Sequence, residues 1–178
     1  MKEAYLAIDF GGGSGRVIAG CLSEGELVLD TIYRFPNRQV RMGRHVYWDF
    51  LALFDEMKNG LRQAVRKGYH IRSIGIDTWG VDFGLIDRNG NLLGNPVCYR
   101  DPRTDGLPEE FFGDNLVRHY SEAGIQVMSI NTLFQLYSMK KSGDTSSVPV
   151  RGLCWVLNWM SLSSRKKLAG PVSPMRAG

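Results

Sequence analysis

A run of glycines close to the N-terminus constrains the fold of this chain more than any other feature. Residues 11–15 read Gly-Gly-Gly-Ser-Gly, and apolar runs of strand length lie on both sides, at 5–10 and 16–21. Both runs are too short for helices, so the pattern predicts two strands joined by a tight glycine turn. Glycine lets a backbone adopt positive φ and approach a ligand closely, and successive N–H groups in such a turn form a concave anion-binding nest.

The polar residues beside this turn indicate a phosphate ligand with a metal ion. Asp9 ends the first strand, where a carboxylate can hold hydrated Mg²⁺, an ion that usually takes one or two protein carboxylates and keeps several waters. Ser14 adds a hydroxyl donor, and Arg16 can contact a phosphate or brace the turn. The alternative is a flexible hairpin turn without a ligand, but this does not account for Asp9 and Arg16.

Two other glycine loops are excluded. A GxGxxG pattern begun at Gly11 requires glycine at position 16, where Arg16 stands, and the P-loop pattern GxxxxGK[ST] is absent. Both of those loops also lead into a helix, whereas this one leads into a strand-like run. A glycine hairpin between two strands, preceded by aspartate, resembles the phosphate-binding turn of actin-like and sugar-kinase ATPases.

The patterns that follow predict an α/β domain. A third strand over 27–35 completes an antiparallel meander, and an irregular stretch runs from Pro36 to Tyr47. Asp49 is the expected N-cap of a helix that stops at Gly68, and a fourth strand covers 71–77. The apolar stripe of the helix comprises Phe50, Leu53, Phe54, Met57, Leu61, Ala64 and Val65. Farther on, we expect strands over 81–86 and 92–99 around an Asn-Gly turn, a loop over 104–110, and helices over 116–123 and 132–141.

Residues 74–83, IGIDTWGVDF, form a second candidate site. Unpaired carboxylates are costly to bury, so Asp77 and Asp82 should face a cavity, water or hydrogen-bond donors. Trp79 can stack on the apolar face of a sugar, and Gly80 permits close approach of the backbone. The alternative is a β-bulge with a core tryptophan and two solvated acids.

Read together, these segments resemble the FGGY carbohydrate kinases, and within that family the rhamnulokinase branch. The matching text stays in order along residues 1 to about 141: AIDFGGGSGRV, YWDF, SIGIDTWGVDFGLID, YRDPRT, EAGIQ and NTLFQL. The resemblance implies an actin-like, ribonuclease-H-like α/β fold with a mixed sheet and flanking helices, in a protein of two domains with a cleft between them. It also implies transfer of the γ-phosphate of ATP to a ketose hydroxyl, here O1 of L-rhamnulose.

The resemblance assigns roles to individual residues. The ATP-binding positions are Gly12, Gly13, Ser14, Gly15 and Arg16, and Asp9 serves Mg²⁺. Gly80 matches a sugar-binding position, with Trp79 and Asp82 as neighbours, and Arg100 and Asp101 line the sugar side of the cleft. The catalytic base of the family lies in a segment beyond this chain. We therefore expect an incomplete kinase N-terminal domain over 1–145 that is inactive alone.

The charge distribution sets residues 146–178 apart. The net charge is +4, but no Asp or Glu follows Asp144, and residues 1–144 hold 17 basic and 18 acidic residues. The body is therefore not a nucleic-acid-binding surface, and we expect neither a nucleic acid nor a membrane as partner. We interpret 146–178 as an aberrant basic tail that is disordered and arises from a shifted reading frame or from another aberrant ending. Two other readings stay open, a non-kinase actin-like ATPase and a protein that uses the tail to bind nucleic acid or membrane.

The three cysteines, Cys21, Cys98 and Cys154, show neither a disulfide framework nor metal-ligand spacing, which favours free thiols in a reducing cytoplasm. The N-terminus has no leader-like apolar region, so we do not expect secretion, and no apolar run has the length of a membrane span.

Overall fold

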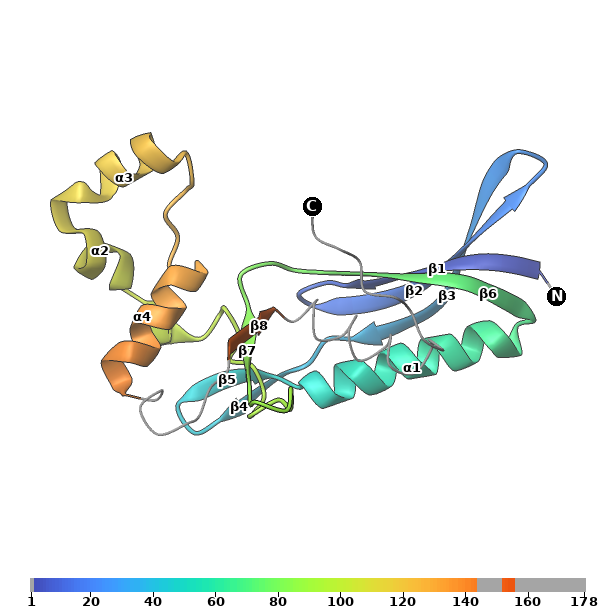
Figure 1. The fold of residues 1–178 in the computed structure, drawn as a ribbon, viewed down its shortest axis with the longest axis horizontal. Coiled ribbons are helices and arrows are strands. Elements are labelled where there is room, and N and C mark those ends of the chain that lie inside the picture. Colours follow the sequence, from blue (N-terminus) through green and yellow to red (C-terminus); the bar gives the residue numbers. More distant parts are fainter. Residues whose placement is uncertain (1, 144–151, 156–178) are drawn as a thin grey trace.

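The computed structural model describes residues 2–143, and the backbone of 152–155. A four-stranded mixed sheet occupies one end of the elongated molecule and a group of short helices the other (Figure 1). The strand order is β3 (Glu26–Pro36), β2 (Ser14–Ser23), β1 (Lys2–Phe10) and β6 (Tyr69–Thr78). The first three strands are antiparallel neighbours and β6 runs parallel to β1, which confirms the predicted meander and mixed sheet.

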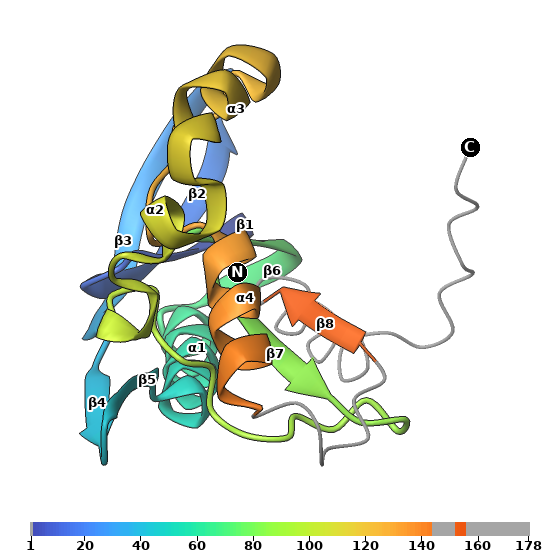
Figure 2. The same ribbon diagram turned by 90° about the vertical axis from the view of Figure 1, so that its left-hand side faces the viewer.

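Helix α1 (Phe50–Arg66) packs along one face of the sheet (Figures 1 and 2). Asp49 caps its start, accepting a hydrogen bond from the Ala52 N–H at 3.2 Å, and Gly68 ends the turn after it with φ of +85°. The helix buries Phe50, Leu53, Met57 and Ala64 against Leu6, Ile8 and Phe10 of β1. Burying one large side chain of this kind contributes about 1.5–3 kcal/mol, so this layer forms the core.

The predicted helical stripe is right except at its end. Val65 is 60% exposed, whereas Gly60, which the predicted stripe did not include, is buried. A methyl group on Gly60 would overlap Val17 of β2, so the absent side chain allows the helix to lie close to the sheet.

The opposite face of the sheet is exposed. Tyr5 and Leu29 are 52% and 64% exposed, and the small residues Ala7 and Gly75 lie between them and the end of the sheet that carries the glycine turn. At that end of the sheet the residues on this face are charged: Arg34, Arg16, Asp9 and Asp77 occupy one row across the four strands.

Several expectations for the other end of the molecule are wrong. Residues 36–47, expected to be irregular, contain a hairpin of β4 (Gln39–Met42) and β5 (His45–Trp48). The return strand expected over 92–99 is replaced by two isolated bridges, Ile86 to Leu92 and Tyr47 to Val97, because Pro96 within this segment lacks an N–H donor.

Strand β7 (Phe83–Ile86) pairs instead with β8 (Gly152–Trp155), a segment remote in sequence. Strand β8 falls inside the predicted tail. The domain boundary at 145 stays a prediction, and residues 144–151 and 156–178 lie outside the described part of the chain.

The loop expected over 104–110 contains the start of a helix. The 3₁₀ turn η1 (Pro102–Thr104) precedes α2 (Leu107–Phe112), where Pro108 occupies the first helical turn, a position that tolerates proline. The turn η2 (Gly113–Asn115) connects α2 to α3 (Leu116–Ala123), and α4 (Thr132–Ser142) follows. Helices α3 and α4 confirm the two predicted helices.

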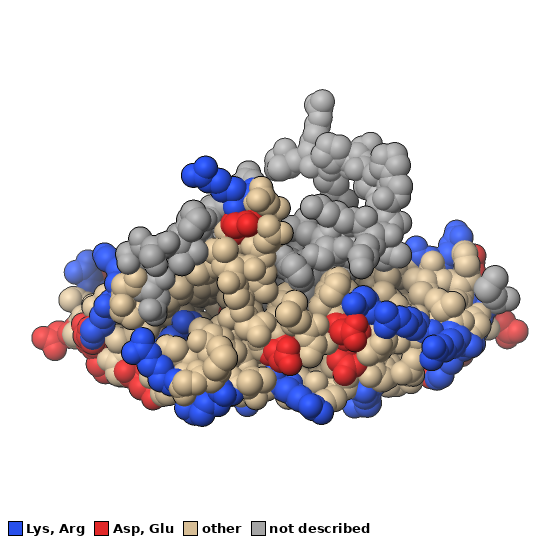
Figure 3. Space-filling model, turned by 90° about the horizontal axis from the view of Figure 1, so that it is seen from below, with Lys and Arg blue, Asp and Glu red and all other residues tan. Residues whose placement is uncertain are grey.

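Acidic and basic side chains are mixed across the face of the molecule that Figure 3 shows, the face on which α1 lies. Within residues 2–143, no helix combines the length and the apolar character needed to cross a bilayer.

The replacement Gly60→Ala tests the close helix–sheet contact. Alanine raises helix propensity by about 1 kcal/mol, but overpacking against Val17 costs about 1–3 kcal/mol, so we expect a net loss of stability. Urea unfolding measures the difference. As a control, Leu51→Ala alters a side chain of the same helix that is 67% exposed and should change stability by less than about 0.5 kcal/mol. A stabilised Gly60→Ala protein would contradict the contact.

Candidate functional site

A hydrogen bond closes the glycine turn, and an ion pair joins the strands that flank it. The Gly11 N–H donates to the Ser14 carbonyl at 2.9 Å, and β2 begins at Ser14. Asp9 and Arg16 face each other across β1 and β2, with Arg16 Nε 2.8 Å from Asp9 Oδ2. Their side chains are 39% and 46% exposed, so the pair contributes only about 0.2–1 kcal/mol. In this structure Arg16 therefore braces the turn through Asp9.

Gly11 and Gly15 are required for space, and none of the turn glycines is required for an unusual backbone angle. None of Gly11, Gly12, Gly13 and Gly15 has a positive φ, so the expected need for positive φ at these positions is wrong, while the close approach of a ligand stays a prediction. A Cβ on Gly11 would lie 2.8 Å from the Ser14 carbonyl oxygen, and a Cβ on Gly15 would overlap the Phe35 ring. A Cβ on Gly13 would meet nothing within 4 Å, which leaves that side of the turn open.

Asn37 donates two hydrogen bonds to the carbonyls of the glycine turn, and this residue was not identified from the sequence. Its backbone N–H donates to the Gly13 carbonyl at 3.1 Å, and its side-chain Nδ2 donates to the Gly11 carbonyl at 2.8 Å. The residue is 7% exposed, and its Oδ1 has no hydrogen-bond partner among the described residues. No local pattern marks Asn37. Only the pairing of Ser14 with Pro36 brings it beside the turn.

Tyr99 and Arg100 lie against the other side of the turn. A Cβ built on Gly12 would be 3.0 Å from Tyr99 Oη and 3.8 Å from Arg100 Nη2. Arg100 Nε donates to Tyr99 Oη at 3.2 Å, and the guanidinium carbon lies 5.3 Å from the centroid of that ring. The structure thus brings the YRDPRT segment to the predicted phosphate site.

Asp82 is buried among donors, one of the three environments expected for it. It is 2% exposed; Oδ2 accepts from Trp48 Nε1 at 2.6 Å and Trp79 Nε1 at 2.8 Å, and Oδ1 accepts from Gln135 Nε2 at 3.2 Å. Burial raises the pKa of Asp82 above its ordinary value, and the hydrogen bonds offset part of that shift. With these contacts Asp82 joins β5, the end of β6 and α4.

The two neighbours of Asp82 in the motif are more accessible. Trp79 is half-buried, and its ring packs on that of Trp48 with centroids 4.3 Å apart. Gly80 is exposed, and a Cβ there would meet nothing within 4 Å. The sugar-binding roles of Trp79, Gly80 and Asp82 stay predictions.

Asp101 is also buried and fixes the backbone around it. It is 3% exposed; Oδ2 accepts from the Val46 N–H at 2.6 Å, and Oδ1 accepts from the Arg103 N–H at 3.0 Å and contacts His45 Nδ1 at 3.1 Å. Asp101 thereby caps η1 and ties it to the β4–β5 hairpin. A sugar-binding role for Asp101 stays a prediction, as it does for Arg100.

Asp9 and Asp77 are register partners on the neighbouring strands β1 and β6, and both side chains reach solvent. Asp77 Oδ1 accepts from the Thr78 N–H at 2.9 Å. No three His, Cys, Asp or Glu side chains gather as a metal-ligand group within the described residues. Mg²⁺ does not need such a group, because it usually binds through one or two carboxylates, substrate phosphates and water. The two carboxylates beside the glycine turn fit that ion.

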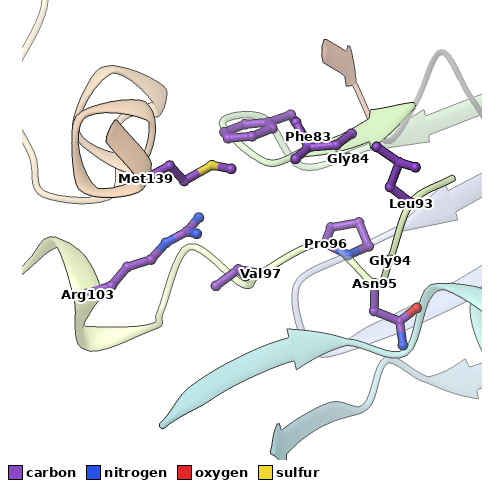
Figure 4. A pocket seen from close by; sticks show the side chains of 10 residues that line it. Phe83, Gly84, Leu93, Gly94, Asn95, Pro96, Val97, Arg103 and Met139 are labelled. Carbon is purple, nitrogen blue, oxygen red and sulfur yellow. The ribbon is translucent and has the colours of Figure 1, made fainter. Parts of the chain in front are cut away.

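The structure also contains a cavity of about 240 Å³ between β7, α4 and the segment 93–97. Its walls are mainly apolar, formed by Phe83, Leu93, Pro96, Val97 and Met139, with Arg103 at one side (Figure 4). Arg103 Nη2 donates to Gln135 Oε1 at 2.8 Å. The cavity is separate from the glycine turn, since none of its lining residues belongs to the turn.

Comparison with known proteins agrees with this arrangement. The family model for the N-terminal domain of FGGY carbohydrate kinases matches residues 4–161. This chain belongs to the FGGY family of carbohydrate kinases. The match extends past residue 145, where the sequence alone predicts the domain to end.

Curated relatives of this FGGY chain include two rhamnulokinases. The one from Bacteroides thetaiotaomicron is 47% identical over 147 residues, covering 82% of this chain and 30% of the relative. The one from Oceanobacillus iheyensis is 45% identical over 143 residues, covering 80% of this chain and 30% of the relative. The chain thus spans about a third of the length of the curated relatives that it matches.

Solved structures show the same fold at low identity. A gluconate kinase from Lactobacillus acidophilus aligns with a TM-score of 0.76 at 11% identity, over 90% of this chain and 32% of the other. A Plasmodium falciparum glycerol kinase, solved with ADP, aligns with a TM-score of 0.68 at 18% identity, over 93% of this chain and 35% of the other. The FGGY chain therefore has the sugar-kinase version of the actin-like fold.

The replacement Asp82→Asn tests the buried carboxylate in this FGGY chain. One carbonyl oxygen and one amide cannot satisfy all the donors that face Asp82, so we expect a loss of about 1–3 kcal/mol. Because burial raises the pKa of Asp82 in the folded protein, ionisation of Asp82 reduces wild-type stability as pH rises through that pKa.

The cost of Asp82→Asn should therefore be larger at about pH 4 than at about pH 7. Urea unfolding of both proteins at each pH measures it. Asp77→Asn, at an exposed carboxylate, is the control and should change stability by less than about 0.5 kcal/mol. A cost that grows toward neutral pH would contradict this account of Asp82.

Proposed function

We propose that this chain supplies the phosphate-binding part of an ATP-dependent kinase that phosphorylates L-rhamnulose at O1. The observation that carries the proposal is the 47% identity to a rhamnulokinase over 147 residues, or 82% of this chain. The sugar is the finer part of the proposal, because the fold is shared with kinases of gluconate and glycerol.

In this mechanism the backbone N–H groups of Gly12, Gly13 and Ser14 bind the terminal phosphates of ATP. The Gly11 and Gly13 carbonyls are held by Asn37, so the turn is rigid before the nucleotide arrives and loses little entropy on binding. Arg16, paired with Asp9, keeps β1 and β2 together at the start of the turn.

Mg²⁺ fits beside Asp9 and Asp77, and when bound it would neutralise phosphate charge during transfer. Gly80 is exposed and Trp79 is half-buried, and the sugar would lie beside them. We assign no catalytic base to this chain. Phosphoryl transfer depends on groups placed on both sides of a cleft, so we expect no turnover by this chain alone.

We infer a cytoplasmic location. Cys21 and Cys98 are buried free thiols, as is usual in a reducing compartment. Burial raises the pKa of Cys98 to about 11, so this thiol stays protonated and unreactive at neutral pH.

Binding of Mg-ATP to the turn is tested with the variants Gly13→Asp and Gly13→Ala. Both side chains fit, because the space beside Gly13 is open and its φ is not positive. The carboxylate of Gly13→Asp should repel the nucleotide phosphates and weaken binding at least about tenfold, which corresponds to about 1.4 kcal/mol. Gly13→Ala is the uncharged control and should bind within about threefold of the wild type.

Isothermal titration calorimetry measures the affinities, and a coupled kinase assay with L-rhamnulose and ATP measures turnover. Equal affinity of all three proteins for Mg-ATP would place the nucleotide elsewhere. Measurable turnover by this chain would contradict the assignment of the base to a segment outside it.

A further inference from the structure

Arg100 lies beside the glycine turn and has no carboxylate partner in the described part of the chain. Arg16 is paired with Asp9 at 2.8 Å. The polar contact of the Arg100 guanidinium is with a neutral group, Tyr99 Oη, at 3.2 Å, and none of the salt bridges among residues 2–143 includes Arg100. A full positive charge is thus exposed within a few ångströms of Gly12.

The backbone that carries Arg100 is fixed from the inside. The Cys98 N–H donates to the Val46 carbonyl at 2.8 Å, and the Asp101 N–H donates to the Cys98 carbonyl at 2.9 Å. Asp101 itself is buried and caps η1, whereas Arg100, one residue earlier, is exposed. Asp101 therefore anchors this segment, and the Arg100 side chain lies in solvent beside the glycine turn.

Tyr99 sets the direction of the guanidinium. The guanidinium carbon of Arg100 lies 5.3 Å from the centroid of the Tyr99 ring, and Arg100 Nε donates a hydrogen bond to the Tyr99 hydroxyl. That hydroxyl packs against Gly12. A side chain at position 12 would displace Tyr99 or Arg100, which gives Gly12 a reason to lack one. Arginine is well suited to phosphate, because its planar fork of N–H donors matches two phosphate oxygens at once.

We propose that Arg100 binds the terminal phosphate of the nucleotide at the glycine turn, with Tyr99 as its positioning residue, and does not bind the sugar ring. This rests on the proposed function, since it requires that the turn holds ATP. It changes the role of Arg100 from sugar recognition, which its motif implied, to recognition of the phosphate that ATP has and ADP lacks.

The test compares Mg-ATP and Mg-ADP binding to the wild type and to Arg100→Gln by isothermal titration calorimetry. Arg100→Gln should weaken Mg-ATP binding at least about tenfold and Mg-ADP binding less than about twofold, because a charge-assisted hydrogen bond to the terminal phosphate is lost. Arg100→Lys should recover part of the difference. Arg72→Gln removes the same charge from the far end of β6, where Arg72 pairs with Glu3, and should change neither affinity.

Each outcome separates this proposal from the function on which it rests. If Arg100→Gln binds ATP as the wild type does, or weakens ATP and ADP equally, the role of Arg100 is wrong while the nucleotide site stands. If Arg100→Gln instead loses only the thermal stabilisation given by L-rhamnulose, Arg100 binds the sugar. If the wild type binds neither nucleotide, both proposals fail. An unchanged circular dichroism spectrum and melting temperature show that the variants are folded.

Discussion

The arrangement of the candidate site depends on one buried carboxylate, Asp82. It accepts hydrogen bonds from Trp48 on β5, Trp79 after β6 and Gln135 on α4, so three segments far apart in the sequence meet at its two oxygens. Burying an ionised carboxylate is costly without such donors, and leaving two indole N–H groups unpaired would also be costly. The carboxylate of Asp82 and its donors therefore stabilise one another. Their hydrogen bonds fix the position of the sheet relative to the helices at the other end of the molecule.

Asp82 also determines which residues lie beside the glycine turn. The Tyr99 N–H lies 3.4 Å from Asp82 Oδ2, so the segment that carries Tyr99 is placed by the same carboxylate. Tyr99 then packs on Gly12, while Phe35 packs on Gly15 from the β3 side. The turn is thus shaped by residues up to 88 positions away in the sequence, as much as by its own glycines. A rigid turn of this kind binds an anion with little loss of chain entropy.

The sequence predicted those parts of the fold that local patterns determine. The first three strands, α1 with its cap at Asp49, and helices α3 and α4 each carry their own periodicity or capping residue. The pairing of β7 with β8 carries no local signal, because strand partners are chosen by contacts that only the folded chain makes. The same limit applies at the site: Gly12 and Arg16 could be found as a motif, whereas Asn37 becomes visible only when β2 and β3 pair.

Motifs also do not separate the residues that hold a site together from those that face a ligand. In IDTWGVDF the acid Asp82 is buried and Gly80 is exposed; in YRDPRT the acid Asp101 is buried and Arg100 is exposed. In both motifs an acid accepts hydrogen bonds from neighbouring segments, and a residue shortly before the acid in the sequence is exposed to solvent. Recognition of the family marks all four positions alike, and only burial divides them into two kinds. By that criterion Gly80 and Arg100 are accessible to a ligand, as Gly13 and Ser14 of the glycine turn are, and the carboxylates Asp82 and Asp101 hold the segments that carry Gly80 and Arg100 in place.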